Sequence, residues 1–328
     1  MSVALDEVVA FLDGKLEVHR FDEEASNGLL LRASETVTRV AAAVNTWFHA
    51  ITRAKFADAD LLLVHHTTWP HIDLELAPQK LDRLKDNGIS LYGAHSALDS
   101  APGFGNPDLL AAAVGVLVEE RFLPYHGGMA GVVGRHDRSF AELAARMRDA
   151  LGVQIEAWEN VPTCERVAIV TGGGHLSSWL EDARKLGADT YITGDVTMYT
   201  KLYARERGIN LIAGTHWATE TFGVKALASQ LEERFGLPWM FIPEQDDIRS
   251  GCRCGSRSSP FIRNVPASAA NGTTAIMIHA ALKPIRSMNT PMAGAPTTAP
   301  NVPPTAVSDC AAPGARGSDA AAVVNTAA

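Results

Sequence analysis

The sequence predicts an α/β fold of two similar α/β lobes related by a pseudo-two-fold axis, followed by a disordered C-terminal tail. Three observations predict it. Short apolar segments alternate with segments of helical periodicity up to about residue 247, which is typical of a largely parallel sheet with helices on its faces. Two segments of the first half recur with similar residues in the second half. Beyond residue 247 the chain becomes rich in Ala, Pro, Ser, Thr and Gly.

The elements of the first half follow from apolar spacing and turn residues. Residues 2–13 place apolar and acidic side chains at helical spacing, which predicts an amphipathic helix. The run 61–64 is short and entirely apolar, as in a buried strand, and the Asn-Pro pair at 106–107 is typical of a helix start. We expect strands over 40–44, 61–64 and 89–94. We expect helices over 2–13, 77–87 and 106–117, and one more that follows the strand 40–44 and ends at about residue 57.

The second half repeats this alternation after a connecting segment. Residues 119–153 contain several glycines and an amphipathic stretch over 139–151 that predicts one helix. Apolar strands and helices then alternate again. We expect strands over 167–170, 190–193, 210–213 and 239–242, and helices over 177–186, 197–207 and 219–235.

These elements divide the chain into four parts. The first lobe covers 1–118, the connector 119–153, the second lobe 154–247 and the Ala/Pro-rich tail 248–328. The tail cannot bury enough apolar surface to fold, so we predict disorder there and assign it no chemistry. Its Cys252 and Cys254 could bind a soft metal, but two free thiols are the simpler interpretation.

Composition and charge exclude several classes of function. The net charge is -8, and residues 1–248 carry 22 Lys and Arg against 35 Asp and Glu. Such an acidic body argues against nucleic acid as a partner, because phosphate binding relies on a basic face. The longest apolar run, over 109–118, is about half of the roughly 20 residues of a membrane span. The N-terminus carries acids where a secretion signal needs basic residues, so we expect a cytoplasmic protein.

The most informative repeat ends in a histidine and a carboxylate. The segments 87–99 and 207–220 each run from a glycine at a helix end, through a short apolar strand, to a histidine with an acid four residues later. The two pairs are His95 with Asp99 and His216 with Glu220. Two related halves that bring imidazole and carboxylate to strand ends can build one shared metal site, for which neither half has enough ligands alone.

A further pair of histidines follows the apolar run at 61–64. His65 and His66 stand where open α/β sheets present active-site groups. Adjacent strand residues point to opposite faces, so both can serve one site only if the strand ends there. The alternative is one exposed and one structural histidine. Because the segment 67–70 ends the strand and histidine is the commonest metal ligand, the sequence favours metal binding.

The number of candidate ligands favours two metal ions. His65, His66, Asp99, His216 and Glu220 exceed what one tetrahedral zinc needs, and a bridging carboxylate could hold two ions about 3.5 to 4 Å apart. Nitrogen and oxygen donors without cysteine suit zinc, manganese, iron or nickel, among which the sequence does not choose. The role of His95 stays open between a ligand and a group that orients Asp99.

A glycine-rich turn at 171–178 offers a candidate substrate site. Gly172, Gly173 and Gly174 lie between a strand and a helix, where backbone N–H groups could hold a phosphate, although a plain tight turn is equally consistent. The turn lacks the pattern of a P-loop or a dinucleotide fingerprint. His175 could exchange protons or have no such role. Asp195 could support a metal ligand or cap a helix. The sequence contains no Gly-x-Ser-x-Gly and no His-Glu-x-x-His motif.

Several of these motifs together resemble a known family. Through these motifs, residues 2–246 resemble the NIF-three-like dinuclear metal-centre family, whose bacterial members are often named GTP cyclohydrolase I type 2 homologues. The segment 67–70 departs from the family, which usually has a proline and an aromatic-rich segment after the paired histidines. The motifs that carry the resemblance are Asn27 to Leu29, Leu61 to His66, Ala94 to Asp99, Thr171 to Gly174, Tyr191 to Asp195 and Gly214 to Glu220.

The resemblance implies a ligand set, an assembly and a function. It implies that His65, His66, Asp99, His216 and Glu220 bind two divalent metals, with one carboxylate bridging, in a ring-shaped homohexamer. We therefore expect a metal-dependent hydrolase of a nucleotide or phosphate-bearing small molecule, in which the ions activate water. In that hypothesis His95 or His175 transfers protons and Gly172 to Gly174 hold the substrate. The alternatives are a non-catalytic metal-binding regulatory or adaptor protein, or a metal storage or delivery protein.

Overall fold

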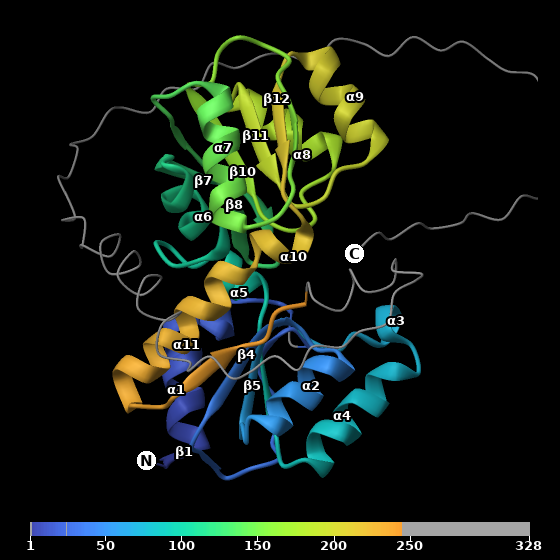
Figure 1. The fold of residues 1–328 in the computed structure, drawn as a ribbon, viewed down its shortest axis with the longest axis vertical. Helices are drawn as coiled ribbons and strands as arrows, with labels where there is room; N and C mark the ends of the chain where they lie inside the picture. The colour runs from blue at the N-terminus through green and yellow to red at the C-terminus, as the bar shows by residue number, and fades with distance from the viewer. Residues whose placement is uncertain (1, 24, 245–328) are drawn as a thin grey trace, which may run out of the picture. The chain divides into compact units, whose positions relative to one another are not determined.

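The computed structural model describes residues 2–23 and 25–244. Its helices and strands form two sheets with helices on both faces of each (Figure 1). The expected α/β class is therefore confirmed, while the pseudo-two-fold relationship stays a prediction. The tail expected over 248–328 lies outside the described residues.

The first sheet is mainly parallel. Its strand order is β13-β4-β5-β6-β2, in which β2 alone of the described strands runs antiparallel to its neighbour, β6. Four of these strands match the segments expected at 40–44, 61–64, 89–94 and 239–242, whereas β2 lies outside the elements that the sequence pattern predicts. The bounds are β2 (Asn27–Leu31), β4 (Val40–Asn45), β5 (Leu61–His66), β6 (Ser90–Ala94) and β13 (Trp239–Phe241).

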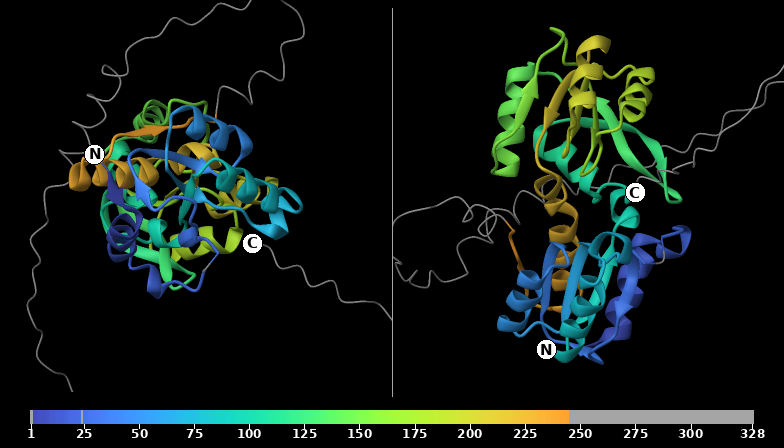
Figure 2. Two further views of the ribbon diagram at one scale, coloured as in Figure 1. Left: turned by 90° about the horizontal axis from the view of Figure 1, so that it is seen from below. Right: turned by 90° about the vertical axis from the view of Figure 1, so that its right-hand side faces the viewer.

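Helices bury both faces of this sheet. The helices α1 (Leu5–Leu16) and α11 (Thr221–Phe235) pack on one face, and α2 (Phe48–Phe56) and α4 (Leu76–Asp86) pack on the other. Figure 2 shows α1 and α2 on opposite sides of the strands. Strands covered on both sides are apolar at every position, which explains the continuous apolar runs in the sequence.

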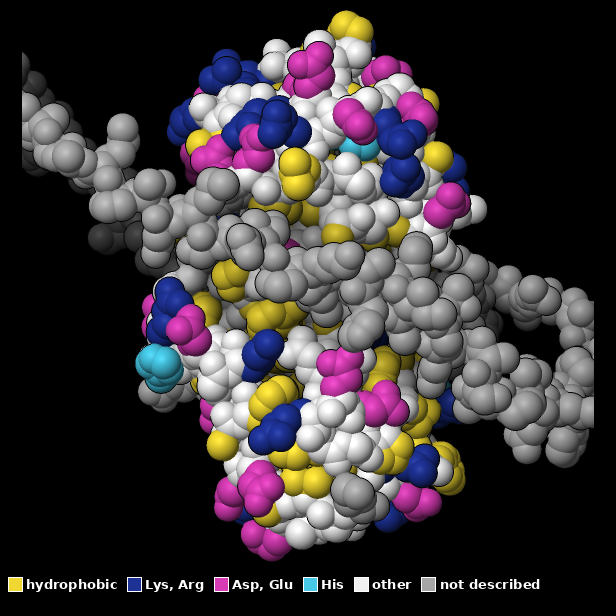
Figure 3. All heavy atoms as spheres, turned by 90° about the vertical axis from the view of Figure 1, so that its left-hand side faces the viewer, with side chains coloured by type: hydrophobic (Ala, Val, Ile, Leu, Met, Phe, Trp, Pro, Cys, Tyr) yellow, Lys and Arg dark blue, Asp and Glu magenta, His cyan; other side chains and the backbone are white. Residues whose placement is uncertain are grey.

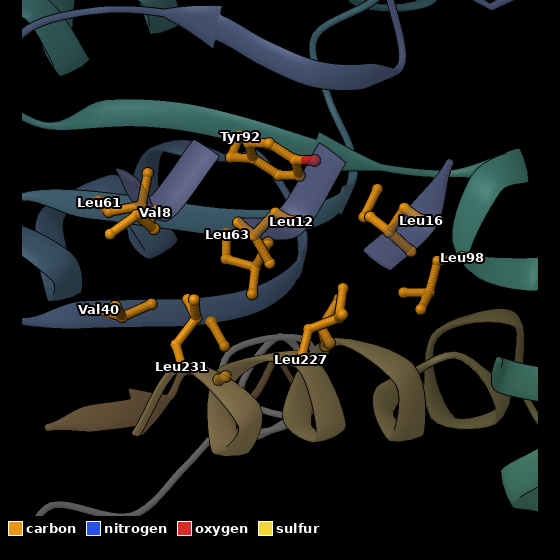
Figure 4. Close-up of a cluster of buried hydrophobic side chains, with 14 of the residues drawn as sticks. Val8, Leu12, Leu16, Val40, Leu61, Leu63, Tyr92, Leu98, Leu227 and Leu231 are labelled. Atoms are coloured by element: carbon orange, nitrogen blue, oxygen red, sulfur yellow. The ribbon is translucent and has the colours of Figure 1, made fainter. Parts of the chain in front are cut away.

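The core between α1, the sheet and α11 is fully enclosed. Leu12 of α1, Leu63 of β5 and Leu227 of α11 meet there and have no exposed surface (Figure 4). Burying a leucine side chain contributes about 1.5 to 3 kcal/mol to folding. The helix α11 therefore belongs to the core of the first sheet, although it follows the second half of the chain in sequence.

The second sheet combines a parallel centre with antiparallel edges. Its order is β7-β8-β10-β11-β12-β9, and β10, β11 and β12 run parallel. The helices α6 and α7 cover one face, and α8 and α9 cover the other. The strands are β7 (Leu117–Tyr125), β8 (Gly128–Arg135), β9 (Glu156–Trp158), β10 (Arg166–Val170), β11 (Thr190–Thr193) and β12 (Asn210–Ala213). The helices are α6 (Asn106–Val114), α7 (Phe140–Leu151), α8 (Ser177–Lys185) and α9 (Met198–Arg207).

Two helices begin where capping residues stand. Ser139 accepts a hydrogen bond from the backbone N–H of Glu142, and the Glu142 side chain accepts one from the Ser139 N–H, so a capping box starts α7. Thr197 and Thr200 form the equivalent arrangement at α9. The helices expected over 139–151 and 197–207 are thus confirmed to within one residue.

The sheets do not follow the simple order of the sequence. The hairpin β7–β8, from the expected connector, joins the second sheet, and β13 pairs with β4 of the first sheet. The helix expected over 106–117 ends at Val114, because Gly115 adopts the left-handed conformation with φ 82° that terminates helices. The division of the chain at residues 118, 153 and 247 stays a prediction. Each sheet contains strands from more than one of these parts.

The remaining elements are short and lie around the sheets. No helix in residues 2–23 or 25–244 is long and apolar enough to cross a membrane. The described residues on the face in Figure 3 present Lys and Arg mixed with Asp and Glu. The short elements are β1 (Val3–Ala4), β3 (Thr36–Val37), the turn of 3-10 helix Val18–Arg20, α3 (Pro70–Asp73), α5 (Ser96–Asp99) and α10 (His216–Thr219).

Candidate metal centre

The predicted site residues lie where strands of both sheets end. His65 and His66 are the last residues of β5, and His95 follows β6. In the second sheet, Gly172 follows β10, and His216 begins α10 shortly after β12. Strand ends of this kind are where α/β proteins bind their ligands.

Two groups of potential ligand atoms share one carboxylate. His66, His216 and Glu220 form one group, and His65, Asp99 and Glu220 form the other, with the atoms of each group within 4.8 Å of one another. Glu220 Oε1 lies 3.3 Å from His216 Nε2 and 3.5 Å from His65 Nε2. Glu220 Oε2 lies 3.2 Å from His66 Nε2. The structure thus brings together all five residues that the sequence predicts as ligands.

Each of the three histidines in these groups presents the same ring nitrogen to the cluster. Their Nδ1 atoms donate hydrogen bonds to oxygens behind the site, which leaves their Nε2 atoms facing Glu220. This arrangement holds an imidazole ready for a metal ion without further movement. The acceptors are Ala94 O for His65 at 2.7 Å, Asn45 Oδ1 for His66 at 2.5 Å and Asp195 Oδ2 for His216 at 2.6 Å.

Asp195 holds the His216 ring and does not cap the following helix. Its carboxylate accepts the hydrogen bond from His216 Nδ1, whereas Thr197 is the N-cap residue of α9. Of the two roles that the sequence leaves open for Asp195, the structure confirms support of His216.

Buried atoms without partners indicate that the cluster fits metal ions. His65 Nε2 and Glu220 Oε2 are both buried, and neither has a hydrogen-bond partner within the described part of the chain. A buried polar atom without a partner costs free energy, so such atoms are rare unless a ligand satisfies them. Both belong to the ligand groups, and imidazole nitrogen with carboxylate oxygen is a donor set that zinc and its neighbours bind. The cluster can therefore hold metal.

The charges of the cluster oppose one another at close range. Burial disfavours protonation of His65, but Asp99 and Glu220 outweigh it and raise the His65 pKa to about 9. Burial also opposes protonation of His216, whose pKa Glu220 and Asp195 raise to about 10. Burial opposes the charge of Glu220, but the surrounding imidazoles hold its pKa well below the usual range. Positive charge is thus favoured at the centre, where divalent cations would replace the imidazole protons.

His95 lies beside the cluster and is held by an acid. Its Nδ1 lies 2.9 Å from Glu23 Oε2 and 3.1 Å from Oε1, to which it donates. With the two histidines of β5 it forms a third group of potential ligand atoms. The side chain that donates to Asp99 Oδ1 is Asn106, at 2.9 Å. Asn106 thus orients Asp99, and the role of His95 stays a prediction.

The glycine turn after β10 shapes the site. Gly172 has a φ of 62°, which favours glycine, and a Cβ there would overlap Glu220 Oε1 and lie 2.9 Å from His216 Nε2. The Gly172 N–H donates to Thr219 Oγ1 at 2.9 Å and is therefore committed within the protein. The expected anion binding by Gly172, Gly173 and Gly174 stays a prediction. Because the Gly172 N–H already donates within the protein, the N–H groups of Gly173 and Gly174 are the candidate donors to an anion.

His175 borders the same space without joining the ligand groups. A Cβ placed on Gly173 would lie 3.5 Å from His216 Cε1 and 3.9 Å from His175 Nδ1. His175 Nδ1 is buried, and the residues that the structure describes provide it with no hydrogen bond. The rings of His175 and His216 therefore both border the space next to Gly173.

Two aromatic side chains stand over the cluster. The Trp69 ring centroid lies 5.4 Å from that of His66 and 5.2 Å from that of His95, and the Tyr125 ring centroid lies 6.3 Å from that of His95. Trp69 follows β5 in the first sheet, and Tyr125 ends β7 in the second. Burial and the acids of the site raise the pKa of the Tyr125 hydroxyl to about 12.

Sequence patterns do not indicate four residues that complete the site. Glu23, Asn45, Asn106 and Tyr125 stand in no motif of recognisable spacing. The one available signal concerns Asn45, which ends β4 and pairs in register with His66 of β5. A polar residue that ends an apolar strand, next to a strand that ends in histidine, is a candidate hydrogen-bond partner for that histidine.

Together, the fold and the site define a class of α/β protein in which histidines and carboxylates from strand ends gather into one cluster able to hold metal. The chain belongs to the Duf34/NIF3 (NGG1p interacting factor 3) family, whose model matches residues 3–248. A protein of Pyrococcus horikoshii named GTP cyclohydrolase 1 type 2 homolog is 34% identical over 244 residues, which are 72% of this chain and 96% of that protein. A protein of Escherichia coli with the same name is 33% identical over 245 residues, which are 72% and 96% of the two chains.

Solved structures agree with this assignment. Protein TTHA1606 from Thermus thermophilus superposes with a TM-score of 0.62 at 32% identity, over 74% of this chain and 98% of that one. A structure titled protein ybgI, unknown function, superposes with a TM-score of 0.67 at 31% identity, over 73% and 98% of the two chains. The described residues therefore have the fold of this family along nearly the whole length of its members.

Proposed function

We propose that this chain is a dinuclear metal-dependent hydrolase that acts on a nucleotide or another phosphate-bearing small molecule. The sharing of Glu220 by two ligand groups carries the proposal, because a single tetrahedral ion would leave at least one of these five residues unused, while each group separately offers three ligand atoms. The names of the relatives support a nucleotide such as GTP as the substrate. Phosphoester hydrolysis is the other natural use of a two-metal site.

The ligands divide between two ions. His66 and His216 would hold one ion, His65 and Asp99 would hold the other, and Glu220 would bridge them. The donor set suits zinc, manganese, iron or nickel. When bound, two such ions lower the pKa of a water molecule and neutralise negative charge that develops on a substrate.

His95 is placed to transfer a proton. Glu23 accepts a hydrogen bond from His95 Nδ1, which fixes the ring and leaves Nε2 free to take a proton from an attacking water or return it to a leaving group. His175, whose buried Nδ1 has no hydrogen-bond partner among the described residues and borders the same space as His216, is the second candidate for this role.

The surroundings of the cluster suit a planar ring with a phosphate. Trp69 and Tyr125 offer aromatic faces near the metals, on which a base can stack. Across the cluster, the turn at Gly173 leaves room next to His216 and His175, because even a Cβ there would meet them only at van der Waals distance. A nucleotide could thus place its base against the aromatic rings and its phosphate at the turn.

Metal content per chain tests this proposal. Elemental analysis of untagged wild-type protein should give close to two divalent ions per chain. His66→Ala and Glu220→Gln should both lower that number, because each removes or weakens ligands of at least one ion. The exposed His71 supplies a matched control, since His71→Ala removes a histidine outside the ligand groups and should leave the metal content unchanged.

The outcomes separate the candidate functions. Two ions together with hydrolysis of nucleotides or phosphoesters would support the enzyme. Two ions without turnover of any such compound, with variants that lose partner binding, would favour the regulatory or adaptor alternative. Wild-type protein that binds no added metal would overturn the proposal.

A further inference from the structure

We propose that Glu244 and Asn45 act together as positioning residues that fix the ring tautomer of His66, so that His66 Nε2 always presents its lone pair to the metal centre. This inference rests on the proposed function for its purpose, but its hydrogen bonds are a property of the protein alone. Neither residue belongs to the ligand groups.

The three residues form a continuous chain of hydrogen bonds. Glu244 Oε2 accepts from Asn45 Nδ2 at 2.7 Å, and Glu244 Oε1 accepts from the backbone N–H of Asn45 at 3.2 Å. Asn45 Oδ1 then accepts from His66 Nδ1 at 2.5 Å. Glu244 is buried, with 7% of its surface exposed, so water does not readily replace these contacts.

The chemistry of the two side chains sets the direction of the chain. An ionised carboxylate only accepts hydrogen bonds, so Glu244 requires the amide nitrogen of Asn45 to point toward it. The amide oxygen of Asn45 must then point toward His66. An amide oxygen accepts and does not donate, so His66 carries its proton on Nδ1 and its lone pair on Nε2.

Asn45 needs this support more than the other acceptors do. His65 donates to a backbone carbonyl, and His216 donates to a carboxylate, neither of which can turn into a donor. An asparagine amide can flip by half a turn and present its NH₂ group instead. Without Glu244, the flipped amide would favour a proton on His66 Nε2, where it would block metal binding.

The test exchanges the amide and the carboxylate. In Glu244→Gln the fixed acceptor is lost, so the Asn45 amide can flip and this variant should lose the tautomer. In Asn45→Asp a carboxylate still accepts from His66 Nδ1 and cannot turn into a donor, so this variant should keep the tautomer. In the double variant Asn45→Asp/Glu244→Gln, the glutamine can donate to the aspartate and still accept from the backbone N–H. The aspartate can accept from His66 Nδ1, so the original tautomer should return.

Two measurements are made on the wild type, the two single variants and the double variant. Histidine ring ¹⁵N shifts of the metal-free protein report which nitrogen of His66 carries the proton. Competition with a chelator reports zinc affinity, which should fall about 10- to 100-fold in Glu244→Gln and recover in the double variant. A structural control is Asn210→Leu, which breaks buried hydrogen bonds to Thr163 and Asn160 in the second sheet and should lower stability without changing either readout.

The results decide the inference independently of the proposed function. Loss of the Nδ1–H tautomer in Glu244→Gln with return in the double variant would support it, whether or not zinc binds. Wild-type protein that shows this tautomer pattern but binds no zinc would overturn only the metal proposal. A Glu244→Gln variant that keeps the wild-type tautomer, or a double variant no better than Glu244→Gln, would overturn the role of Glu244 and Asn45.

Discussion

Asn106 donates a hydrogen bond from Nδ2 to Asp99 Oδ1 at 2.9 Å, deep in the protein. The other end of the same amide accepts from the backbone N–H of Gly223 in α11, at 2.8 Å. One fully buried side chain thus connects a candidate metal ligand to the helix that follows the Glu220 segment. The position of the carboxylate depends on contacts between segments far apart in sequence.

Replacing this asparagine should affect both stability and metal binding. Asn106→Leu leaves the Gly223 N–H buried without an acceptor and removes the donor to Asp99, so we expect a loss of about 1 to 3 kcal/mol in the free energy of unfolding. Urea denaturation measures it. A variant with unchanged stability and full metal content would contradict the proposed role of the Asn106 amide.

The glycine turn offers a comparison between adjacent positions. Gly172→Ala should lower stability by about 1 to 2 kcal/mol from the left-handed backbone alone and should also displace Glu220, which its Cβ would overlap. We therefore expect reduced metal content. Gly173→Ala is the control, because Gly173 has no positive φ and its Cβ would meet neighbours only at 3.5 Å or more. Equal metal content in the two variants would contradict the steric role of Gly172.

Metal binding should strengthen as the pH rises. In the metal-free protein, the carboxylates raise the pKa of His65 to about 9 and that of His216 to about 10. At pH 7 both rings therefore hold protons that a metal ion must displace. We expect affinity to increase with pH up to about pH 9 to 10, by at most about tenfold per pH unit for each proton displaced. Calorimetry in buffers of different ionisation enthalpy counts the released protons, and a count of zero would contradict the prediction.

The metal-free protein should show the opposite dependence. A histidine whose pKa is higher in the folded than in the unfolded state stabilises the fold fully below its unfolded pKa of about 6.5, and this stabilisation is lost as the pH rises through the folded pKa. For His65 and His216 the loss falls between about pH 6.5 and pH 10. Thermal unfolding of chelator-treated protein across this range measures it. His216→Gln should reduce the slope, and a variant that keeps the wild-type slope would count against this assignment.

Proton transfer by His95 should separate from metal binding. His95→Ala should keep both ions yet reduce kcat by about 10²- to 10⁴-fold, the usual contribution of a general acid or base. Glu23→Gln should cause a smaller loss, because the ring remains but its charged partner is gone. Parallel assays of turnover and metal content check both. If His95→Ala lost its metal instead, His95 would be a ligand, as the third group of atoms allows.

Much of the local structure can be predicted from the sequence. The segments 190–193 and 210–213 match β11 and β12 residue for residue, and the Ser139 and Thr197 caps locate two helix starts. These features depend on neighbours within a few residues, where apolar spacing and capping chemistry act directly. The antiparallel strands β2, β7 and β8 lie outside the predicted strands, because polar residues or glycine interrupt their apolar pattern: Asn27 and Gly28 in β2, charged residues in β7 and three glycines in β8.

The sequence by itself determined which strands and helices form the α/β pattern, and it placed His65, His66, Asp99, His216 and Glu220 at strand ends. Only the tertiary structure decided that Glu220 is shared by two ligand groups, that β13 returns to the first sheet, and that Asn45 lies beside His66. The physical reason is the range of the interactions. Periodicity and capping act along the chain, whereas hydrogen bonds and charges act between side chains that strand pairing and helix packing bring together from distant positions.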